Sequence, residues 1–350
     1  MLFISNQAFD EFISTVHPKY SGKCKELEAD ILALLLTKPT GGLSSGSADS
    51  SVCKRKVVIT KADEMQHNSL QHGGTRPISF TPLDPTAVQL IRKIGSGHVC
   101  ETYEGFVTST GTQVAVKKPL TTCTSDDERE KYTELWRQEL ALMKLISRHP
   151  NICEFVGYSG SSTCFDSMYL CYEYLSGGCL ADIILDTSSG FDPIRVGLEV
   201  ASGMLHLHQL DIIHRDLKPA NVILDSKGCA KIADFGLSCR ISIGNEMTAE
   251  TGTYRWMAPE VIRHEHYSLS ADVYSFGILF WELHSRMRPF DELTPFQAAY
   301  QVAVAHMRPT IPPETTRPVV KLLQNLWHRD QSSRPTFDEI CLELHSLMSS

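Results

Sequence analysis

A polar segment in the middle of the chain has the residue types of a catalytic loop. It runs from His214 to Asn221 and brings a carboxylate (Asp216), an ammonium group (Lys218) and a carboxamide within six positions. Placing these groups in a core would cost a large desolvation free energy. Two apolar stretches of the buried-strand type flank it, Ile212–Ile213 and Val222–Leu224. We therefore expect a loop that is anchored at both ends and presents its polar groups at a site; the alternative is an ordinary solvated loop.

A second acidic motif is placed in the same way. The tripeptide Asp-Phe-Gly begins at Asp234, 18 residues after Asp216, and directly follows the largely apolar stretch Ala230–Ala233. The side chains of Asn221 and Asp234 offer hard oxygen ligands of the kind that Mg²⁺ prefers. The two segments together predict a magnesium site.

Upstream features could hold a phosphate. A Gly-Ser-Gly turn (residues 95–97) follows an apolar run, and such a turn lets backbone N–H groups approach phosphate oxygens. Lys117 ends another apolar run and needs an anion, which Glu139 could supply when no phosphate is bound. Each feature is weak by itself, because a hairpin turn and a lysine on a strand edge explain them equally well.

The surrounding pattern predicts a β-rich part followed by a helical part. Four β-type runs are expected at residues 90–94, 102–108, 113–117 and 168–174, and a charged helix at residues 127–146. After Gly177-Gly178 the apolar residues recur at helical spacing. The two stripes predicted to be buried are Ile194, Leu198, Ala201 and Leu205, and Val319, Leu322, Leu323 and Leu326. Ligands often bind in the cleft between two such parts.

The composition bounds the classes of function. The chain has 350 residues, a net charge of −8 and 42% hydrophobic residues, which argues against a nucleic-acid-binding protein and against wholesale disorder. Its 11 cysteines form no C-x-x-C pair, which favours reduced thiols and a cytoplasmic protein, with the nucleus also open. No apolar run approaches the roughly 20 residues of a membrane-spanning helix, and residues 1–15 lack the basic flank of a signal peptide. We therefore expect no membrane insertion.

The first part of the chain is predicted to be an extension. Residues 1–85 contain the patterns of one or two short helices, and residues 40–51 are a linker rich in Gly and Ser. Residues 1–38 could dock a partner, although a loosely attached tail explains them as well. A packed domain is predicted from residue 88 onward.

In their order and spacing, these motifs resemble the eukaryotic-type protein kinases, and the resemblance covers residues 88–347. The motifs in chain order are a partial Gly-rich loop, Lys117, Glu139, His214–Asn221, Asp234–Gly236, Ala258–Glu260, Asp272–Gly277 and Arg334-Pro335. The strings Trp256–Glu260 and Asp272–Gly277 resemble the tyrosine-kinase-like (TKL) group, the relatives of Raf and the mixed-lineage kinases. Lys218 and Gly252-Thr253 resemble serine/threonine-specific members, with dual specificity as the main alternative.

The resemblance implies a fold and a nucleotide site. The fold would be α+β and bilobal, with a small β-rich N-lobe (88–174) that carries one regulatory helix and a larger α-helical C-lobe (176–347). ATP would bind between the lobes. The implied ATP-contacting residues are Ile94, Gly95, Ser96, Gly97, His98, Val99, Cys100, Glu101, Thr102, Ala115, Lys117, Glu173, Leu175 and Ile223.

The resemblance also implies catalytic roles. Lys117, aligned by Glu139, would hold the ATP phosphates, and Asn221 and Asp234 would bind Mg²⁺. Asp216 would orient the hydroxyl of a protein substrate and accept its proton. Lys218 would steady the γ-phosphoryl group.

Regulation and support of the site are implied as well. Arg215 would bind a phosphate on Thr248 or Thr251 of the activation segment, while Thr253 would shape the substrate pocket. Three further residues have implied supporting roles. Glu260 and Arg334 would form an ion pair, and Asp272 would support the catalytic loop.

Three residues depart from the family pattern. Cys100 replaces the third glycine of the Gly-rich loop and Thr102 replaces the usual valine, so we expect a raised KM for the nucleotide. Tyr172 precedes Glu173 and would narrow the pocket behind the adenine, or simply pack in the core. The altered loop leaves one rival function open: a pseudokinase that serves as a nucleotide-binding signalling scaffold.

Overall fold

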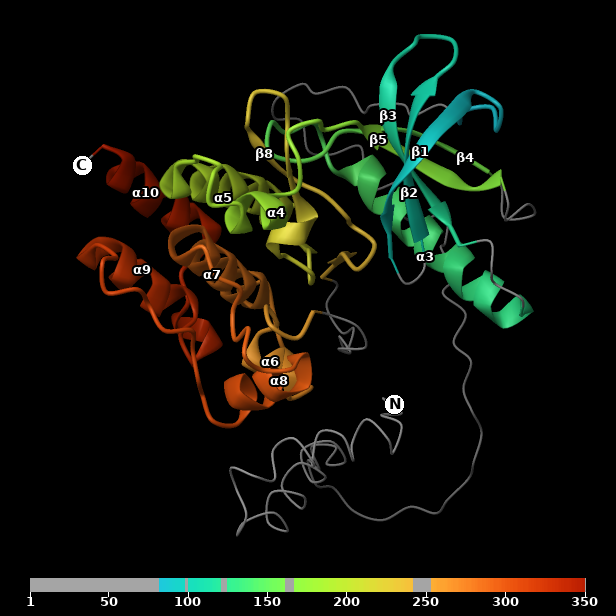
Figure 1. Cartoon of the computed structure of the whole chain (residues 1–350). Helices are drawn as coiled ribbons and strands as arrows, with labels where there is room; N and C mark the ends of the chain where they lie inside the picture. Colours follow the sequence, from blue (N-terminus) through green and yellow to red (C-terminus); the bar gives the residue numbers. More distant parts are fainter. Residues whose placement is uncertain (1–81, 98–99, 121–124, 161–166, 242–252, 350) are drawn as a thin grey trace, which may run out of the picture. The chain divides into compact units, whose positions relative to one another are not determined.

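The chain folds into a two-lobed α+β domain, as predicted. The computed structural model describes residues 82–97, 100–120, 125–160, 167–241 and 253–349 (Figure 1). The short helices and linker predicted within residues 1–81, and the docking segment 1–38, lie outside these residues.

A five-stranded sheet and one helix form the N-lobe. The elements are β1 (Val88–Ser96), β2 (Cys100–Val107), β3 (Gln113–Pro119), α3 (Asp126–Leu145), β4 (Phe155–Ser159) and β5 (Tyr169–Glu173). Neighbouring strands are antiparallel in the order β1-β2-β3-β5-β4. The predicted strands and the charged helix are confirmed, whereas β4 was not predicted.

The residues just before β1 already belong to this lobe. Leu83 N donates to Tyr158 O at 2.7 Å, and the Tyr169 hydroxyl donates to Asp84 O at 2.9 Å. Leu83 also packs over Gly157 of β4, where a Cβ atom would lie only 3.1 Å from it. The packed N-lobe therefore begins a few residues earlier than the predicted position 88.

Strand β3 shows how the sheet aims a polar group. Val114 and Val116 are fully buried in a small apolar cluster of the N-lobe. Because side chains alternate across a strand, Ala115 and Lys117 point to the opposite face. Ala115 packs against the main core there. The alternation thus directs the ammonium group of Lys117 toward helix α3 and the second lobe.

Helices make up most of the C-lobe. Its elements are α4 (Leu180–Leu185), α5 (Pro193–Gln209), β6 (Ile212–Ile213), the 3₁₀ helix η4 (Pro219–Asn221), β7 (Val222–Leu224), β8 (Ala230–Ile232), β9 (Cys239–Arg240), α6 (Pro259–Ile262), α7 (Ser270–Ser285), α8 (Pro295–Ala303), α9 (Arg317–Leu326), the 3₁₀ helix η5 (Gln331–Ser333) and α10 (Phe337–Met348). β6 pairs with β9 and β7 pairs with β8. Side-chain caps mark several helix starts: Asp192 caps α5, and Thr294 and Thr336 form capping boxes with α8 and α10.

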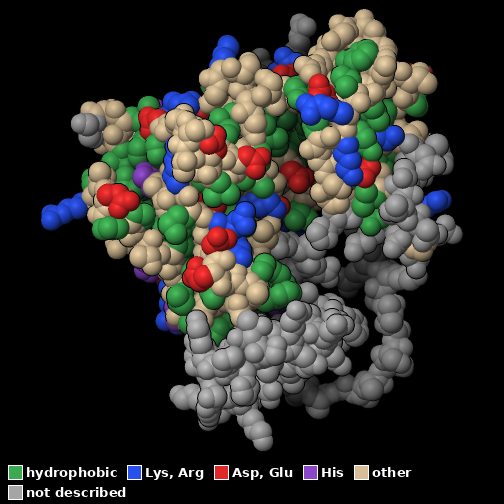
Figure 2. Space-filling model, viewed as in Figure 1, with side chains coloured by type: hydrophobic (Ala, Val, Ile, Leu, Met, Phe, Trp, Pro, Cys, Tyr) green, Lys and Arg blue, Asp and Glu red, His purple; other side chains and the backbone are tan. Residues whose placement is uncertain are grey.

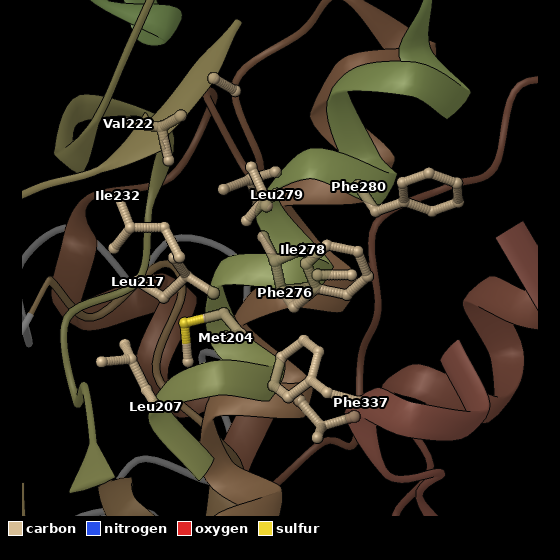
Figure 3. Close-up of a cluster of buried hydrophobic side chains, with 14 of the residues drawn as sticks. Met204, Leu207, Leu217, Val222, Ile232, Phe276, Ile278, Leu279, Phe280 and Phe337 are labelled. Carbon is tan, nitrogen blue, oxygen red and sulfur yellow. The ribbon is translucent and has the colours of Figure 1, made fainter. Parts of the chain in front are cut away.

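Helix α7 is the centre of the C-lobe core. Every residue from Ala271 to Leu283 is buried. Figure 3 shows side chains of α7 beside Met204 and Leu207 of α5 and Phe337 of α10. Phe276 lies against Phe337, with ring centroids 5.5 Å apart. A helix that is buried on every side and mainly apolar is expected in this position.

The two predicted buried stripes differ in outcome. All four predicted residues of α9 are buried, as expected. In α5 only Ala201 of the predicted four is fully buried; the others are partly buried. The fully buried set is instead Val196, Gly197, Val200, Ala201, Gly203, Met204 and Leu207. Helix α5 contacts α7, α10, β6 and β8, so its buried face is broader than one stripe and is turned relative to the prediction.

The connection between the lobes passes close to the C-lobe backbone. Gly177 N donates to Leu224 O at 2.9 Å. A Cβ atom on Gly177 would lie 2.2 Å from Asp225 O, which real side chains do not allow. Glycine is therefore required here, and the contact fixes the chain after β5 against β7.

The surface of the described residues is mixed in charge. On the face drawn in Figure 2, Lys and Arg side chains lie among Asp and Glu side chains. Among the described residues no helix is both long and apolar enough to span a membrane.

Candidate active site

Two ion pairs meet at Lys117, where the two lobes come together. Its Nζ atom lies 2.9 and 2.8 Å from the two carboxylate oxygens of Glu139 on α3. The same Nζ atom lies 2.8 Å from Oδ1 of Asp234, which follows β8 in the C-lobe. One ammonium group therefore links β3, α3 and the C-lobe.

The electrostatics of this cluster favour the charged forms. Burial disfavours the ammonium form of Lys117, but the carboxylates of Glu139 and Asp234 outweigh burial and raise its pKa above the usual value. The ammonium group of Lys117 in turn lowers the pKa of Asp234 to about 2, against the opposing effect of burial. Asp234 is therefore ionised at neutral pH, and about half of its side chain, 52%, is exposed.

The Asp272 carboxylate holds the start of the loop from His214 to Asn221 through hydrogen bonds to its backbone. This carboxylate of α7 accepts the backbone N–H of His214 at 2.8 Å and that of Arg215 at 2.9 Å. Burial alone would raise the pKa of Asp272, but its hydrogen bond to the His208 ring and its other polar partners lower the pKa overall. The predicted support of the catalytic loop by Asp272 is present.

Asp216 lies at the centre of a polar network. Its Oδ2 atom accepts from Lys218 Nζ at 2.7 Å and from Asn221 Nδ2 at 2.9 Å. Its Oδ1 atom accepts from the Thr253 hydroxyl at 3.1 Å, and Lys218 Nζ also lies 2.6 Å from that hydroxyl oxygen. Hydrogen bonds therefore hold the carboxylate at both of its oxygens.

Backbone hydrogen bonds join the two clusters. Ala233 N, directly before Asp234, donates to Asn221 O at 2.8 Å. Asp234, which follows β8 after Ala233, has a φ of 60°, in the left-handed region. The strand pair β7–β8 therefore brings Asn221 and Asp234 to one end of the same small sheet.

Asn221 and Asp234 fit a magnesium ion. The amide nitrogen of Asn221 donates to the backbone oxygen and the carboxylate of Asp216. Its amide oxygen must therefore point the other way. A carboxamide oxygen and an ionised, half-exposed carboxylate are a suitable partial ligand set for Mg²⁺, which usually keeps several waters and binds substrate phosphates.

The implied nucleotide-contacting residues lie on β1, β2, β3, β7 and the segment around the end of β5. Gly95, Ser96, Cys100, Glu101 and Thr102 belong to β1 and β2, and Gly97 N bonds Cys100 O at 2.8 Å between them. His98 and Val99 lie outside the described residues. Ile94 is 40% exposed, and Ala115 and Ile223 are partly buried.

The connecting segment after β5 carries the other two implied contacts. The Glu173 carboxylate accepts from Lys231 Nζ at 2.7 Å and from Glu154 N at 2.7 Å, so this side chain holds the segment in place. Among the described residues, no hydrogen bond occupies the backbone N–H of Leu175. A backbone donor at this position could bind the edge of a purine.

The regulatory residues are only partly described. Arg215 has a φ of 66° and its Nε atom donates to Leu237 O, so its guanidinium lies next to the segment that follows Asp234. Thr248 and Thr251 lie outside the described residues.

Sequence reasoning missed two contacts of the site, the bond from Lys117 to Asp234 and the bond from Tyr172 to Glu139. The Tyr172 hydroxyl donates to Glu139 Oε1 at 2.6 Å in a buried setting. The position of Tyr172 one residue before Glu173 pointed to the pocket behind the nucleotide, but its hydroxyl partner depends on the register of β5 against α3, which no local pattern reveals.

The chain is similar to known proteins over the described domain. A family model of the protein kinase domain matches residues 88–345. Serine/threonine-protein kinase STY46 of Arabidopsis thaliana is 39% identical over 260 residues, which are 73% of this chain and 43% of that protein.

Two further relatives have related names. Serine/threonine/tyrosine-protein kinase HT1 of the same plant is 35% identical over 255 residues, 71% of this chain and 63% of that protein. Probable serine/threonine-protein kinase drkC of Dictyostelium discoideum is 36% identical over 274 residues, 76% of this chain and 35% of that protein. The chain thus spans less than two thirds of the length of these relatives.

Proposed function

The chain belongs to the protein kinase domain family. We propose that it transfers the γ-phosphoryl group of ATP to serine or threonine hydroxyls of proteins. We further propose that it is a kinase of the TKL group and acts in intracellular signalling. The observation that carries the proposal is the meeting of two clusters. Lys117, Glu139 and Asp234 form one, and Asp216, Lys218 and Asn221 form the other. A cation for phosphates and a fixed carboxylate for a hydroxyl are the two requirements of this reaction.

The residues divide the work as follows. Lys117 binds the α- and β-phosphates, and Glu139 keeps its ammonium group directed into the site. Asp216 orients the attacking hydroxyl and accepts its proton, while Lys218 neutralises charge on the group in transfer. Little covalent chemistry is asked of the protein, so positioning and fixed charge supply most of the rate enhancement.

Asn221 and Asp234 would hold Mg²⁺. When bound, the ion neutralises phosphate charge that would otherwise repel the incoming hydroxyl. The low pKa of Asp234 keeps this ligand ionised over the whole physiological range.

Specificity for serine and threonine is supported by Thr253. Its hydroxyl bonds both Lys218 and Asp216, so it closes the substrate site next to the base. One relative is named a serine/threonine/tyrosine-protein kinase, and activity on tyrosine is the alternative that a direct assay separates.

The test is phosphate transfer by the purified full chain. We expect labelled phosphate from ATP to appear on serine and threonine of a generic acceptor such as casein, in the presence of Mg²⁺ and not of excess EDTA. Phosphoamino-acid analysis identifies the acceptor residue. Nucleotide binding without any transfer would contradict the proposal and support the pseudokinase.

The departures in the Gly-rich loop give a prediction about nucleotide affinity. Cys100 adds a side chain where the family has glycine, and Thr102 places a hydroxyl near the expected base position. We expect the double change Cys100→Gly and Thr102→Val to lower the KM for ATP several-fold, since burying a methyl in place of a hydroxyl is worth about 1 kcal/mol. Steady-state kinetics with varied ATP measure this. An unchanged or higher KM would refute the explanation.

Activation by phosphorylation is a further part of the proposal. Arg215 stands beside the segment after Asp234, and a phosphate on Thr248 or Thr251 would give it a charge-assisted partner. We expect the double change Thr248→Ala and Thr251→Ala to reduce kcat about tenfold or more, measured on protein first incubated with ATP and Mg²⁺. Thr187→Ala, at an exposed position in the C-lobe, serves as a control for loss of a threonine. Full activity of the double variant would exclude both sites.

Location and docking complete the proposal. We propose a cytoplasmic protein, with the nucleus also open; buried free thiols such as Cys153 and Cys171 suit a reducing compartment. Residues 1–38 are proposed to recruit a partner. Deletion of residues 1–80 should then preserve activity on casein while reducing phosphorylation of the partner in cells.

A further inference from the structure

The hydroxyl of Tyr172 makes a contact that the mechanism above does not use. It donates to Glu139 Oε1 at 2.6 Å, a short distance typical of a hydrogen bond to a carboxylate. Both residues are buried, with Tyr172 at 8% and Glu139 at 5% exposure. A hydrogen bond to a charged group in such surroundings is stronger than one in water.

Glu139 needs a second donor because Lys117 is shared. The ammonium group of Lys117 bonds both oxygens of Glu139 and also Oδ1 of Asp234. In the proposed reaction the same ammonium group must also bind phosphate oxygens, so part of its bonding leaves Glu139. Among the described residues, Tyr172 is the other side chain that donates to this carboxylate. The Tyr172 hydroxyl keeps one hydrogen bond on this carboxylate when Lys117 shifts part of its bonding to phosphate.

The donor is held rigidly. Tyr172 lies on β5, opposite Ala115 of β3 on one side and Phe155 of β4 on the other. Its ring also packs edge-on against Phe155, with centroids 5.6 Å apart. Burial and the neighbouring carboxylate of Glu139 raise the pKa of Tyr172 well above its usual value, so the hydroxyl keeps its proton and remains a donor at every physiological pH.

We propose that Tyr172 is a positioning residue for phosphoryl transfer: its hydroxyl fixes Glu139, and thereby α3 and the ammonium group of Lys117, in the orientation that the reaction needs. The inference rests on the proposed kinase activity and adds a role that core packing alone would not give. A tyrosine that only filled space, or only narrowed the pocket behind the nucleotide, would act through its ring.

Tyr172→Phe separates these roles because it keeps the ring and removes the hydroxyl. We expect kcat for transfer to casein to fall about tenfold, the effect of losing one hydrogen bond to a charged group. The KM for ATP should change less than kcat, because the hydroxyl does not touch the nucleotide. Circular dichroism and the thermal unfolding midpoint check that the variant is folded.

Tyr169→Phe is the matched control. Tyr169 lies on the same strand, and its hydroxyl also donates a hydrogen bond, but to the backbone oxygen of Asp84. This change should leave kcat within twofold of the wild type. If both variants kept the wild-type kcat, the inference would fail although the kinase activity stood; an inactive wild type would instead remove the proposed function.

A double-mutant cycle with Glu139→Ala tests the route of the effect. Once the acceptor carboxylate is gone, removal of the Tyr172 hydroxyl should have no further effect on the remaining rate, measured with radiolabelled ATP. An equal fold-loss from Tyr172→Phe in both backgrounds would show that the hydroxyl does not act through Glu139 and would overturn the proposal.

Discussion

Asp216→Asn should reduce phosphate transfer to a protein acceptor on the order of 10³-fold while the domain stays folded. The substitution keeps the size of the side chain and its contacts to Lys218, Asn221 and Thr253 within reach, but removes the basic oxygen and the charge. Loss of a positioned general base costs about 10²–10⁴ in rate. The effect should fall on kcat, with little change in the KM for ATP, because Asp216 would contact the substrate hydroxyl.

Asp211→Asn provides the control for this change. Asp211 lies five residues earlier, its side chain is 64% exposed, and its φ of 57° is one that asparagine adopts readily. The control should keep both the rate and the unfolding midpoint of the wild type. An active Asp216→Asn protein would mean that Asp216 is not the base and that the proposed mechanism is wrong.

The sequence was most informative about the site where polar or charged residues stand next to stretches predicted to be buried. Asp216, Asn221 and Asp234 stood out because charged and amide groups lie close to apolar strands. The structure places Asn221 and Asp234 at one end of the β7–β8 pair, and Asp216 is hydrogen-bonded to Asn221 there. The ion pair of Lys117 with Glu139 was also expected. The additional bond from Lys117 to Asp234, and that from Tyr172 to Glu139, were not, because each joins elements far apart in the sequence.

The fold, like the site, was predictable where local sequence patterns decide it and not where contacts between distant segments do. Helix α9 was predicted with its correct buried face because it is polar on the other side. Strand β4 was missed because its five residues include Gly157, which interrupts the β-type pattern. Leu83 packs against this glycine, where a Cβ atom would lie 3.1 Å from it. Helix α7 has no polar face and therefore no helical stripe, so its position at the centre of the core could be read only from the structure.

The ion pair between Glu260 and Arg334 is the most deeply buried in the described C-lobe. The side chains are 3% and 0% exposed, and two hydrogen bonds of 2.6 and 2.8 Å join them. Arg334 also donates to His328 O and Ser270 O, and its guanidinium lies 5.2 Å from the ring centroid of Tyr274. These bonds tie the segment after Trp256 to α7 and to the chain before α10. The pair is therefore a structural contact that joins three segments of the C-lobe.

Arg334→Met should lower the free energy of unfolding by about 3–5 kcal/mol, because it leaves the Glu260 carboxylate buried without its cation. Adding Glu260→Gln removes the unpaired buried charge and should restore part of the lost free energy of unfolding. If the two changes acted independently, their losses of free energy would simply add.

Arg137→Met is the control at an exposed ion pair. Arg137 pairs with Glu134 at 3.5 Å, and both side chains are about half exposed, so the change should lower the free energy of unfolding by no more than about 1 kcal/mol. Urea unfolding followed by circular dichroism measures all three proteins. Equal losses for Arg334→Met and Arg137→Met would show that burial does not govern the strength of this pair.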